Sequence, residues 1–405
     1  MAIQPQDQSF RQLSGAEVVL WTLQHAGVEV MFGLPGGAIL TLYETLKSFP
    51  GLKHVLTRHE QGAGHAASGY AQATGRLGVC IATSGPGATN LVTALMDAHM
   101  YSITDICCSV VAPITKHAVE ATEADNVGRA MSHAISQALS GRPGPVLVSI
   151  TKDALAGSTC FVAKGIACPF TAPSPTVEPR LIQRAVEHLT AAERPVLYVG
   201  GRVISSNDAA ELRELAEMLN LPVVTTLMAR GAFPDDHRQH VGMPGMHGTV
   251  AAVAALQEAD LLLVAGARFD GRVTGELSSF APGATVVHID IDAAELSGKR
   301  RADVALHADC GVALAVLIEH IRVAGHRTGC SRLTAWWKTL NAWRSRYPIG
   351  YVQDTKHSPS IRDRASGGPD CGLETCLPHL CRRVVSKPEW TPVSAVLATD
   401  ATRAL

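Results

Sequence analysis

Short strand-like runs alternate with helical segments through the first part of the chain. The strand-like runs are 28–32, 78–82 and 145–150, and a capping box formed by Ser14 and Glu17 starts the first helix. Strands of this kind, separated by helices, predict a buried parallel sheet. Ligands of such sheets bind at the carboxyl ends of the strands. The glycine-rich turns that follow the first two runs are therefore candidate binding sites.

The pattern repeats in a second segment after a stretch rich in Ala, Ser, Thr, Gly and Pro. Its predicted strands are 195–199, 222–226, 261–264 and 285–291, and its predicted helices lie near 180–193, 208–219, 249–258 and 311–323. We therefore expect an α/β fold with doubly wound parallel sheets. The expected domains are 10–155, with an internal gap near 102–112, and 180–327, joined by a linker at 156–179.

The remainder, 328–405, has a different pattern. The tryptophans between 331 and 346 recur at helical spacing, which is more typical of packing than of a binding site. Cys371, Cys376 and Cys381 recur every five residues, but they lack the closely spaced cysteine pairs of zinc sites, so no metal site is predicted. We interpret the rest as an unpatterned tail, and one hypothesis is that its end is sequence read in a shifted frame.

Composition narrows the class of protein. The 405 residues include 35 Lys plus Arg and 36 Asp plus Glu, and this balance argues against a nucleic-acid-binding protein. No secretory signal and no transmembrane run is visible, and the ten cysteines are scattered. We therefore expect a cytoplasmic protein with reduced thiols, without nucleic-acid or membrane partners.

The segment 58–75 carries the strongest candidate for chemistry. Glu60 stands at the junction of a strand and a helix built largely of Gly and Ala. A glutamate among apolar groups can exchange a proton near neutral pH. The alternative is a solvated glutamate that stabilises the helix N-terminus, and the segment alone does not separate the two.

Glycine-rich loops supply the other candidate sites. The turn 83–90 opens a helix whose free amides could hold an anion, although no Walker or Gly-x-Gly-x-x-Gly motif occurs there. In the second segment, loops at 242–249, 266–275 and 288–292 follow strands and fit a dinucleotide. Arg268 and Arg272 would meet phosphates. The alternative is that these loops only turn the chain and cap helices.

These stretches together resemble the catalytic large subunits of acetolactate synthase, a thiamine-diphosphate enzyme family. The resemblance rests on FGLPGG, RHEQGAGHAASGYA, TSGPGATN, SGRPGPVLV, TTLMARGAFP, GMPGMHGTV, GARFDGRVTG and VVHIDIDAAE, and it covers about 10–355. It implies a pyrimidine-binding domain, a central FAD-binding domain and a pyrophosphate-binding domain, with thiamine diphosphate, FAD and Mg²⁺ as cofactors. The implied reaction condenses two 2-keto acids with loss of CO2.

The resemblance also assigns residues to the cofactors. Glu60 would be the catalytic glutamate facing N1′ of the aminopyrimidine ring, with Gly36, Gly37, Pro86 and Asn90 beside that ring, and Lys116 would lie near the substrate channel. FAD would be held by Gly200, Gly201, Leu227, Met228, Gly245, Met246, His247, Gly248, Gly266, Arg268, Asp270, Arg272 and Asp290. The implied partners are 2-keto acids, a second copy or an intact large subunit, and a small regulatory subunit.

The sequence departs from the family in four places, one of them Ala293, which stands where the family has proline. Roughly twenty residues, including a core strand of the pyrimidine domain, are missing near 102–112. No Gly-Asp-Gly motif for Mg²⁺ and diphosphate occurs, so the pyrophosphate domain is expected to be mostly missing, with 328–405 as its stump and the unpatterned tail. Arg202 stands where the family has a third glycine beside the flavin. We therefore expect an acetolactate synthase-like protein that is inactive alone. The alternative is a non-catalytic FAD-binding or interaction module.

Overall fold

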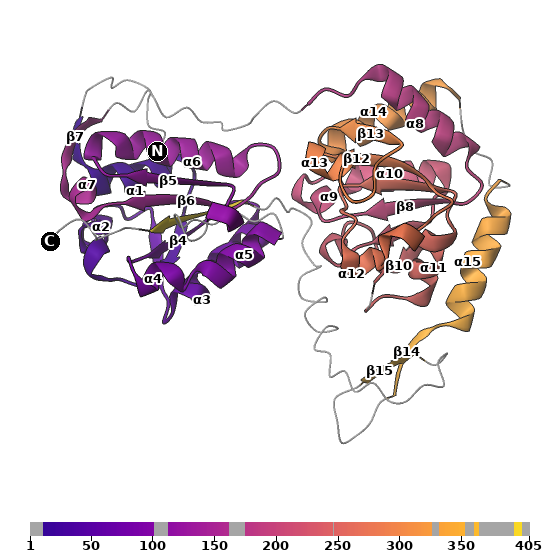
Figure 1. The fold of residues 1–405 in the computed structure, drawn as a ribbon, viewed down its shortest axis with the longest axis horizontal. Helices are drawn as coiled ribbons and strands as arrows, with labels where there is room; N and C mark the ends of the chain where they lie inside the picture. The colour runs from indigo at the N-terminus through magenta and orange to yellow at the C-terminus, as the bar shows by residue number, and fades with distance from the viewer. Residues whose placement is uncertain are drawn as a thin grey trace. The chain divides into compact units, whose positions relative to one another are not determined.

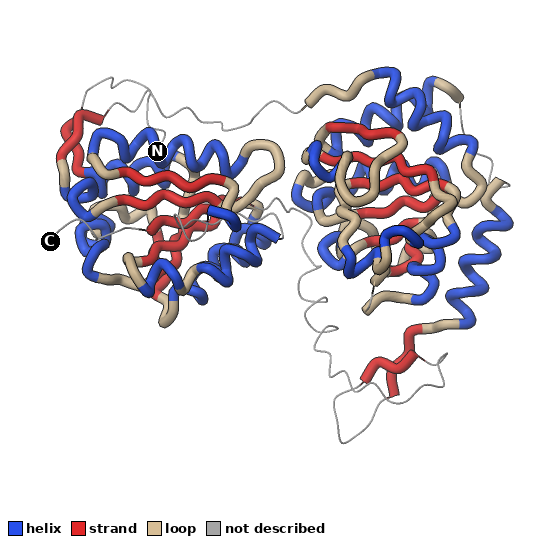
Figure 2. Tube along the Cα trace, in the orientation of Figure 1, coloured by secondary structure: helices blue, strands red, loops and turns tan. Residues whose placement is uncertain are grey.

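The structure is a computed structural model, which describes residues 11–100, 112–161, 175–245, 247–325, 332–352, 360–363 and 393–398. The chain forms two compact units. The first comprises Met1–Pro173 with Trp390–Leu405, and the second comprises Ser174–Glu389. Both units are built from helices around a parallel sheet (Figure 1, Figure 2). The expected α/β class with parallel sheets is therefore confirmed.

The N-terminal unit contains a six-stranded parallel sheet of order β3-β2-β4-β16-β6-β5. Its strands are β2 (Val30–Gly33), β3 (Lys53–Leu56), β4 (Leu77–Ala82), β5 (His117–Ala121), β6 (Val146–Ile150) and β16 (Val393–Ala398). A separate antiparallel pair joins β1 (Arg11–Ser14) to β7 (Ser158–Phe161). All residues of β4 and β6 are buried, as expected of strands covered on both faces.

Helices cover both faces of this sheet. They are α1 (Gly15–His25), α2 (Leu40–Leu46), α3 (Glu60–Thr74), α4 (Pro86–Thr89), α5 (Val92–Met100), α6 (Ala124–Leu139) and α7 (Lys152–Ala156), with 3-10 turns η1 (Gly37–Ile39) and η2 (Ala112–Ile114). Helices α1 and α6 pack together on one face, and α3 and α5 on the other (Figure 1). The predicted capping box is present, because the Glu17 amide donates to Ser14 Oγ at 3.2 Å and Ser14 N–H donates to Glu17 Oε2 at 2.7 Å.

The second unit contains a six-stranded sheet of order β10-β9-β8-β11-β12-β13, also parallel. Its strands are β8 (Pro195–Val199), β9 (Val223–Thr225), β10 (His240–Gly242), β11 (Leu261–Ala265), β12 (Thr285–Asp290) and β13 (Val304–His307). The four strands predicted from the sequence are confirmed as β8, β9, β11 and β12. The short edge strands β10 and β13 were not predicted.

The predicted helices of this unit are also present. They are α8 (Pro179–Ala191), α10 (Ala209–Leu219), α11 (Val250–Glu258) and α14 (Cys310–Val323), and the shorter helical elements are α9 (Arg202–Ser205), η4 (Leu227–Ala229), α12 (Gly271–Thr274), η5 (Leu277–Ser279) and α13 (Ala293–Leu296). Strands β14 (Ile349–Val352) and β15 (Ser360–Asp363) form an antiparallel pair. Within the described residues, no helix is long and apolar enough to cross a membrane.

Two described parts of the segment 328–405 pack on other elements of the chain. Helix α15 (Thr334–Arg346) packs on the second unit, where Trp336 Nε1 donates to the Pro195 carbonyl at 3.1 Å and Trp337 Nε1 to that of Asn220 at 3.0 Å. The packing interpretation of these tryptophans is thus confirmed. Strand β16 instead enters the sheet of the N-terminal unit. The expectation of an unpatterned tail is wrong for 393–398, because a partner sheet, and not local periodicity, defines this strand.

Candidate cofactor sites

Glu60 is the first residue of α3, and three residues separate it from the end of strand β3. Its side chain is largely buried, with 7% of the residue exposed, and Asn90 Nδ2 donates a hydrogen bond to its Oε2 at 2.9 Å. The solvated glutamate that the sequence left open is therefore excluded. The hydrogen bond holds one carboxylate oxygen beside the turn that follows β4, and so joins two residues predicted to contact the same ring.

Two close approaches of the backbone surround this carboxylate. A Cβ atom placed on Gly87 would lie 3.2 Å from Glu60 Oε1 and 2.8 Å from Thr83 Cγ2. A Cβ atom on Gly36 would lie 2.5 Å from Thr83 Cβ. Thr83 therefore fits between the turn after β2 and the helix that begins at Pro86. Thr83 belongs to the TSGPGATN motif but was not predicted as a site residue; its place immediately after β4 was the available signal.

The predicted residues of the first site lie at one edge of the sheet, except Lys116. Gly36 and Gly37 follow β2, and Pro86 and Asn90 follow β4, so all lie at carboxyl ends of parallel strands. Lys116 immediately precedes β5, and its N–H donates to the Pro145 carbonyl at 2.6 Å, just before β6. It therefore lies at the amino-terminal edge. Its ammonium group donates to the Ser140 carbonyl beyond the end of α6.

The described residues predicted to hold FAD gather at the carboxyl edge of the second sheet. Gly200 and Gly201 follow β8, Leu227 and Met228 follow β9, Gly245, His247 and Gly248 follow β10, Gly266, Arg268, Asp270 and Arg272 follow β11, and Asp290 ends β12. Met246 lies outside the described residues. Leu227 and Met228 are 53% and 41% exposed, although both are large apolar side chains. Such exposed side chains at a strand edge suit contact with a ligand.

Three glycines of this edge are required by the chain itself. A Cβ atom on Gly200 would lie 2.0 Å from the Gly266 carbonyl oxygen, and one on Gly201 would lie 2.8 Å from Met228 Cβ. Gly266 has φ +58, and its Cβ would lie 2.4 Å from Arg202 Cβ. The turns after β8 and β11 therefore pack against each other. These glycines would be needed whether or not a cofactor binds.

Arg202 lies within a charged cluster that the sequence analysis did not identify. Its guanidinium is 3.7 Å from Asp309 Oδ2, and Asp208 lies nearby, against the backbone of Gly311. The pKa of Asp208 is raised to about 6, mainly because its carboxyl group is buried. Burial also raises the pKa of the Cys310 thiol. Asp309 caps helix α14 through the Gly311 amide, and an aspartate before a helix was the signal available in the sequence.

Two further polar groups are buried in or near this edge. Asp290 is 7% exposed and accepts a hydrogen bond from the Asp292 amide at 2.8 Å. His288 is fully buried, its Nε2 lies 2.9 Å from the Ala267 carbonyl oxygen, and burial lowers its pKa to about 4. The ring is therefore neutral near pH 7 and donates from Nε2. Asp270 accepts from the Arg272 amide at 2.9 Å, and so caps the short helix α12.

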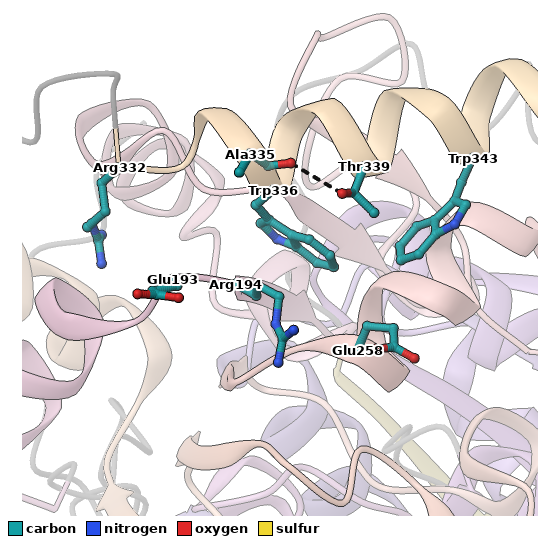
Figure 3. Close-up of a pocket in the computed structure, with 8 residues that line it drawn as sticks. All are labelled: Glu193, Arg194, Glu258, Arg332, Ala335, Trp336, Thr339 and Trp343. Atoms are coloured by element: carbon teal, nitrogen blue, oxygen red, sulfur yellow. Dashed lines mark hydrogen bonds between the residues drawn. The ribbon is translucent and has the colours of Figure 1, made fainter.

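A separate pocket of about 440 Å³ lies beneath helix α15 (Figure 3). Trp336 and Trp343 project into it from the helix, and Arg194 and Glu258 line the opposite side. None of the predicted site residues lines it. The indole rings contact edge to face with centroids 5.7 Å apart, which indicates packing of α15 onto the unit.

No group of three or more His, Cys, Asp or Glu residues that could hold a metal ion occurs in the part of the chain that the structure describes. Cys371, Cys376 and Cys381 lie outside that part. The two candidate sites thus offer hydrogen-bonding and packing groups, and the described residues contain no such group of metal ligands.

Comparison with known proteins assigns both units. Residues 13–137 match the model of the thiamine pyrophosphate enzyme N-terminal TPP-binding domain, and residues 182–317 match that of the thiamine pyrophosphate enzyme central domain. An acetolactate synthase of Mycobacterium bovis is 49% identical over 85% of this chain and 59% of its own length.

Two further relatives agree. The acetolactate synthase large subunit of Corynebacterium glutamicum is 44% identical over 84% of this chain and 57% of its own length. The isozyme 3 large subunit of Escherichia coli is 39% identical over 87% of this chain and 65% of its own length. The chain thus spans less than two thirds of the length of these relatives. It belongs to the family of acetolactate synthase large subunits, with the N-terminal and central domains of the thiamine pyrophosphate enzymes.

Proposed function

We propose that this chain supplies the aminopyrimidine-contacting half of an acetolactate synthase active site. The reaction is condensation of two pyruvates to 2-acetolactate with loss of CO2, in the cytoplasm, as the family resemblance implies. The observation that supports it is the buried Glu60 carboxylate, bonded by Asn90 at 2.9 Å and flanked by Gly87. In this proposal Gly36, Gly37 and Pro86 lie beside the same ring.

Glu60 has the chemistry that this role needs. Its Oε2 accepts from Asn90, while Oε1 is the oxygen beside Gly87. A carboxyl group held in this way can carry or release a proton at the N1′ position of an aminopyrimidine. Bound thiamine diphosphate would supply the carbon nucleophile that attacks the 2-keto acid. Burial of Glu60 keeps water from competing for that proton.

The residues of this polypeptide do not fit the diphosphate end of the cofactor. No Gly-Asp-Gly motif occurs in the 405 residues, and the described residues contain no cluster of acidic and other metal ligands. Mg²⁺ prefers several oxygen ligands in octahedral geometry, and diphosphate needs the cation. We therefore propose that a partner large subunit supplies the pyrophosphate site across a dimer, as the resemblance implies. The 405-residue chain would be inactive alone.

The central unit is proposed to bind FAD at the carboxyl edge of its sheet. The support is the gathering of loops after β8, β9, β10 and β11 at one edge, with exposed Leu227 and Met228 and buried Asp290. Arg268 and Arg272 would meet the phosphates, and Asp290 a ribose hydroxyl. Arg202, paired with Asp309, stands where the resemblance implies a glycine beside the flavin, so this position departs from the FAD-binding pattern.

Two assays test the proposal. The purified chain is incubated with FAD and passed over a sizing column, and the visible absorbance of flavin in the protein peak is measured. We expect retained flavin. The same chain is then assayed with pyruvate, thiamine diphosphate and Mg²⁺, and we expect no acetolactate. Acetolactate formation by the chain alone would contradict the need for a partner. A protein peak without flavin absorbance would contradict the proposed FAD site.

A further inference from the structure

The sheet of the N-terminal unit contains a strand from the far end of the chain. Five of its strands lie between Val30 and Ile150, and the sixth, β16, comes from Val393–Ala398. In Figure 1 this yellow strand lies between β4 and β6. It pairs in parallel with β4 from Val393↔Leu77 to Ala398↔Ala82, and with β6 from Val396↔Leu147 to Ala398↔Ser149.

The order of the strands explains why a position is available there. Strands β4 and β5 follow each other along the chain, yet β16 and β6 separate them in the sheet. Successive strands of a doubly wound sheet are usually neighbours. The connection from β4 to β5 therefore skips the position beside β4. The gap that the sequence analysis predicted near 102–112 falls within this connection, and residues 101–111 lie outside the described part.

An unfilled position would leave two edges in the middle of the sheet. Every residue of β4 and of β6 is buried with β16 in place, and without a strand there the backbone groups on the facing edges would lose their partners in the middle of the sheet. Buried N–H and C=O groups are almost always hydrogen-bonded, because an unpaired one loses its hydration without compensation. The N-terminal unit therefore requires a strand at this position.

The sequence of 393–398 suits a central parallel strand. It reads Val-Ser-Ala-Val-Leu-Ala, carries no charge and contains no proline. Central parallel strands are typically uninterrupted apolar runs. Pro392 stands immediately before the strand, where the missing N–H does not interrupt the ladder.

We propose that residues 393–398 act as a donor strand that closes the N-terminal unit, and that the position between β4 and β6 is a binding slot for such a strand. Addition of an extended segment to a sheet edge is a general mode of peptide recognition. The slot selects an apolar strand of six residues in parallel orientation. Its occupant is the C-terminal segment of this same chain. Ala398 pairs with Ala82, the residue before Thr83, so the donor strand also supports the turn that carries Asn90.

Hydrogen exchange of a truncated chain tests the donor strand. The chain that ends at Glu389 is compared with the full chain, and backbone amide exchange is measured in β4 and β6. We expect exchange there to become at least about tenfold faster, with β11 and β12 of the second unit unchanged. A synthetic peptide of residues 390–405 restores protection, and a scrambled peptide of the same composition does not. Equal exchange of β4 and β6 in the two chains would overturn the proposal.

A point variant covers the case in which the truncated chain does not fold. Val396→Pro removes a backbone donor at a position paired with both β4 and β6, and Ala401→Pro is the matched control beyond the strand. We expect faster exchange in β4 and β6 for Val396→Pro alone. Identical exchange in the two proline variants contradicts the donor strand. Protection of β4 in the full chain that rises with protein concentration would show that a second copy supplies the strand, and would overturn the assignment to the same chain.

Discussion

The two sheets have the same size and the same parallel arrangement, but they are completed differently. All strands of the second sheet come from one continuous stretch between Pro195 and His307. The first sheet takes five strands from Val30–Ile150 and one from Val393–Ala398. A fold whose strands are contiguous in sequence can form without distant segments. The N-terminal unit, by contrast, must close a very long loop before its sheet is complete.

The largest expected effects come from a matched pair of substitutions that each create a cavity in one of the two sheets. Leu147→Ala removes a buried side chain from β6, and Leu263→Ala removes one from β11. Each substitution should lower the free energy of unfolding of its own unit by about 2–5 kcal/mol. We expect each substitution to make its own unit unfold at a lower urea concentration, with the other unit unchanged. The measurement is urea unfolding followed by hydrogen exchange of β6 and β11.

Either of two results with these variants would contradict the expected difference between the units. If Leu263→Ala also increased exchange in β6, the two units would unfold cooperatively and the contrast between them would be lost. If Leu147→Ala changed neither unit, β6 would not belong to a packed sheet.

Acid should destabilise the second unit. Burial lowers the pKa of His240 and of His288 to about 4, below the value of about 6.5 for an unfolded chain. The unfolded state therefore binds more protons between these values, and stability is full above pH 6.5 and is lost as the pH falls toward 4. The loss is roughly 3 kcal/mol for each histidine.

Asp208 acts in the opposite direction, because its raised pKa of about 6 makes the folded state gain stability as the pH falls from 6 toward 4. His288→Gln, compared with the unchanged chain at pH 7 and pH 5, isolates one histidine while Asp208 stays in place. We expect the difference in unfolding free energy between the two pH values to shrink in the variant. The same pH dependence in both chains would contradict the assignment to His288.

Helix caps give the smallest expected effects. Ser14→Ala removes the cap of α1 in the first unit, and Thr249→Ala removes that of α11 in the second. Each should lower stability by about 1 kcal/mol, visible as faster exchange in its own helix. Thr190→Ala, in the last turn of α8, is the control, since its hydroxyl donates only within the helix and is not an N-cap. An equal effect of all three variants would rule out capping as the cause.

Local patterns predicted most helices and strands because each buries an apolar run or stripe. The capping box at Ser14 and the strands β8, β11 and β12 are determined by residues close together in the sequence. Strand β16 could not be predicted, because 393–398 has no periodic neighbours and only the sheet defines it. The short strands β10 and β13 were missed for a related reason: three or four residues at an edge carry little pattern.

Sites were predicted unevenly. Glu60 and Asn90 follow strands whose carboxyl ends share one edge of the sheet, so the motifs predicted this edge for both, but the hydrogen bond between them was not predicted. Lys116 precedes its strand and lies at the other edge, a difference that depends on where β5 begins. The cluster of Arg202 with Asp208 and Asp309 was not predicted, because three separate turns bring these residues together.

Complementation tests the central claim most directly. This chain is co-purified with a full-length acetolactate synthase large subunit whose own glutamate at the position matching Glu60 is replaced by glutamine. Acetolactate formation is measured for the unchanged chain, for Glu60→Gln, and for Glu120→Gln, which alters an exposed glutamate in β5. We predict activity with the unchanged chain and with Glu120→Gln, and loss of that activity with Glu60→Gln. Equal activity with all three chains, or none with any of them in a co-purified complex, would contradict the role of Glu60.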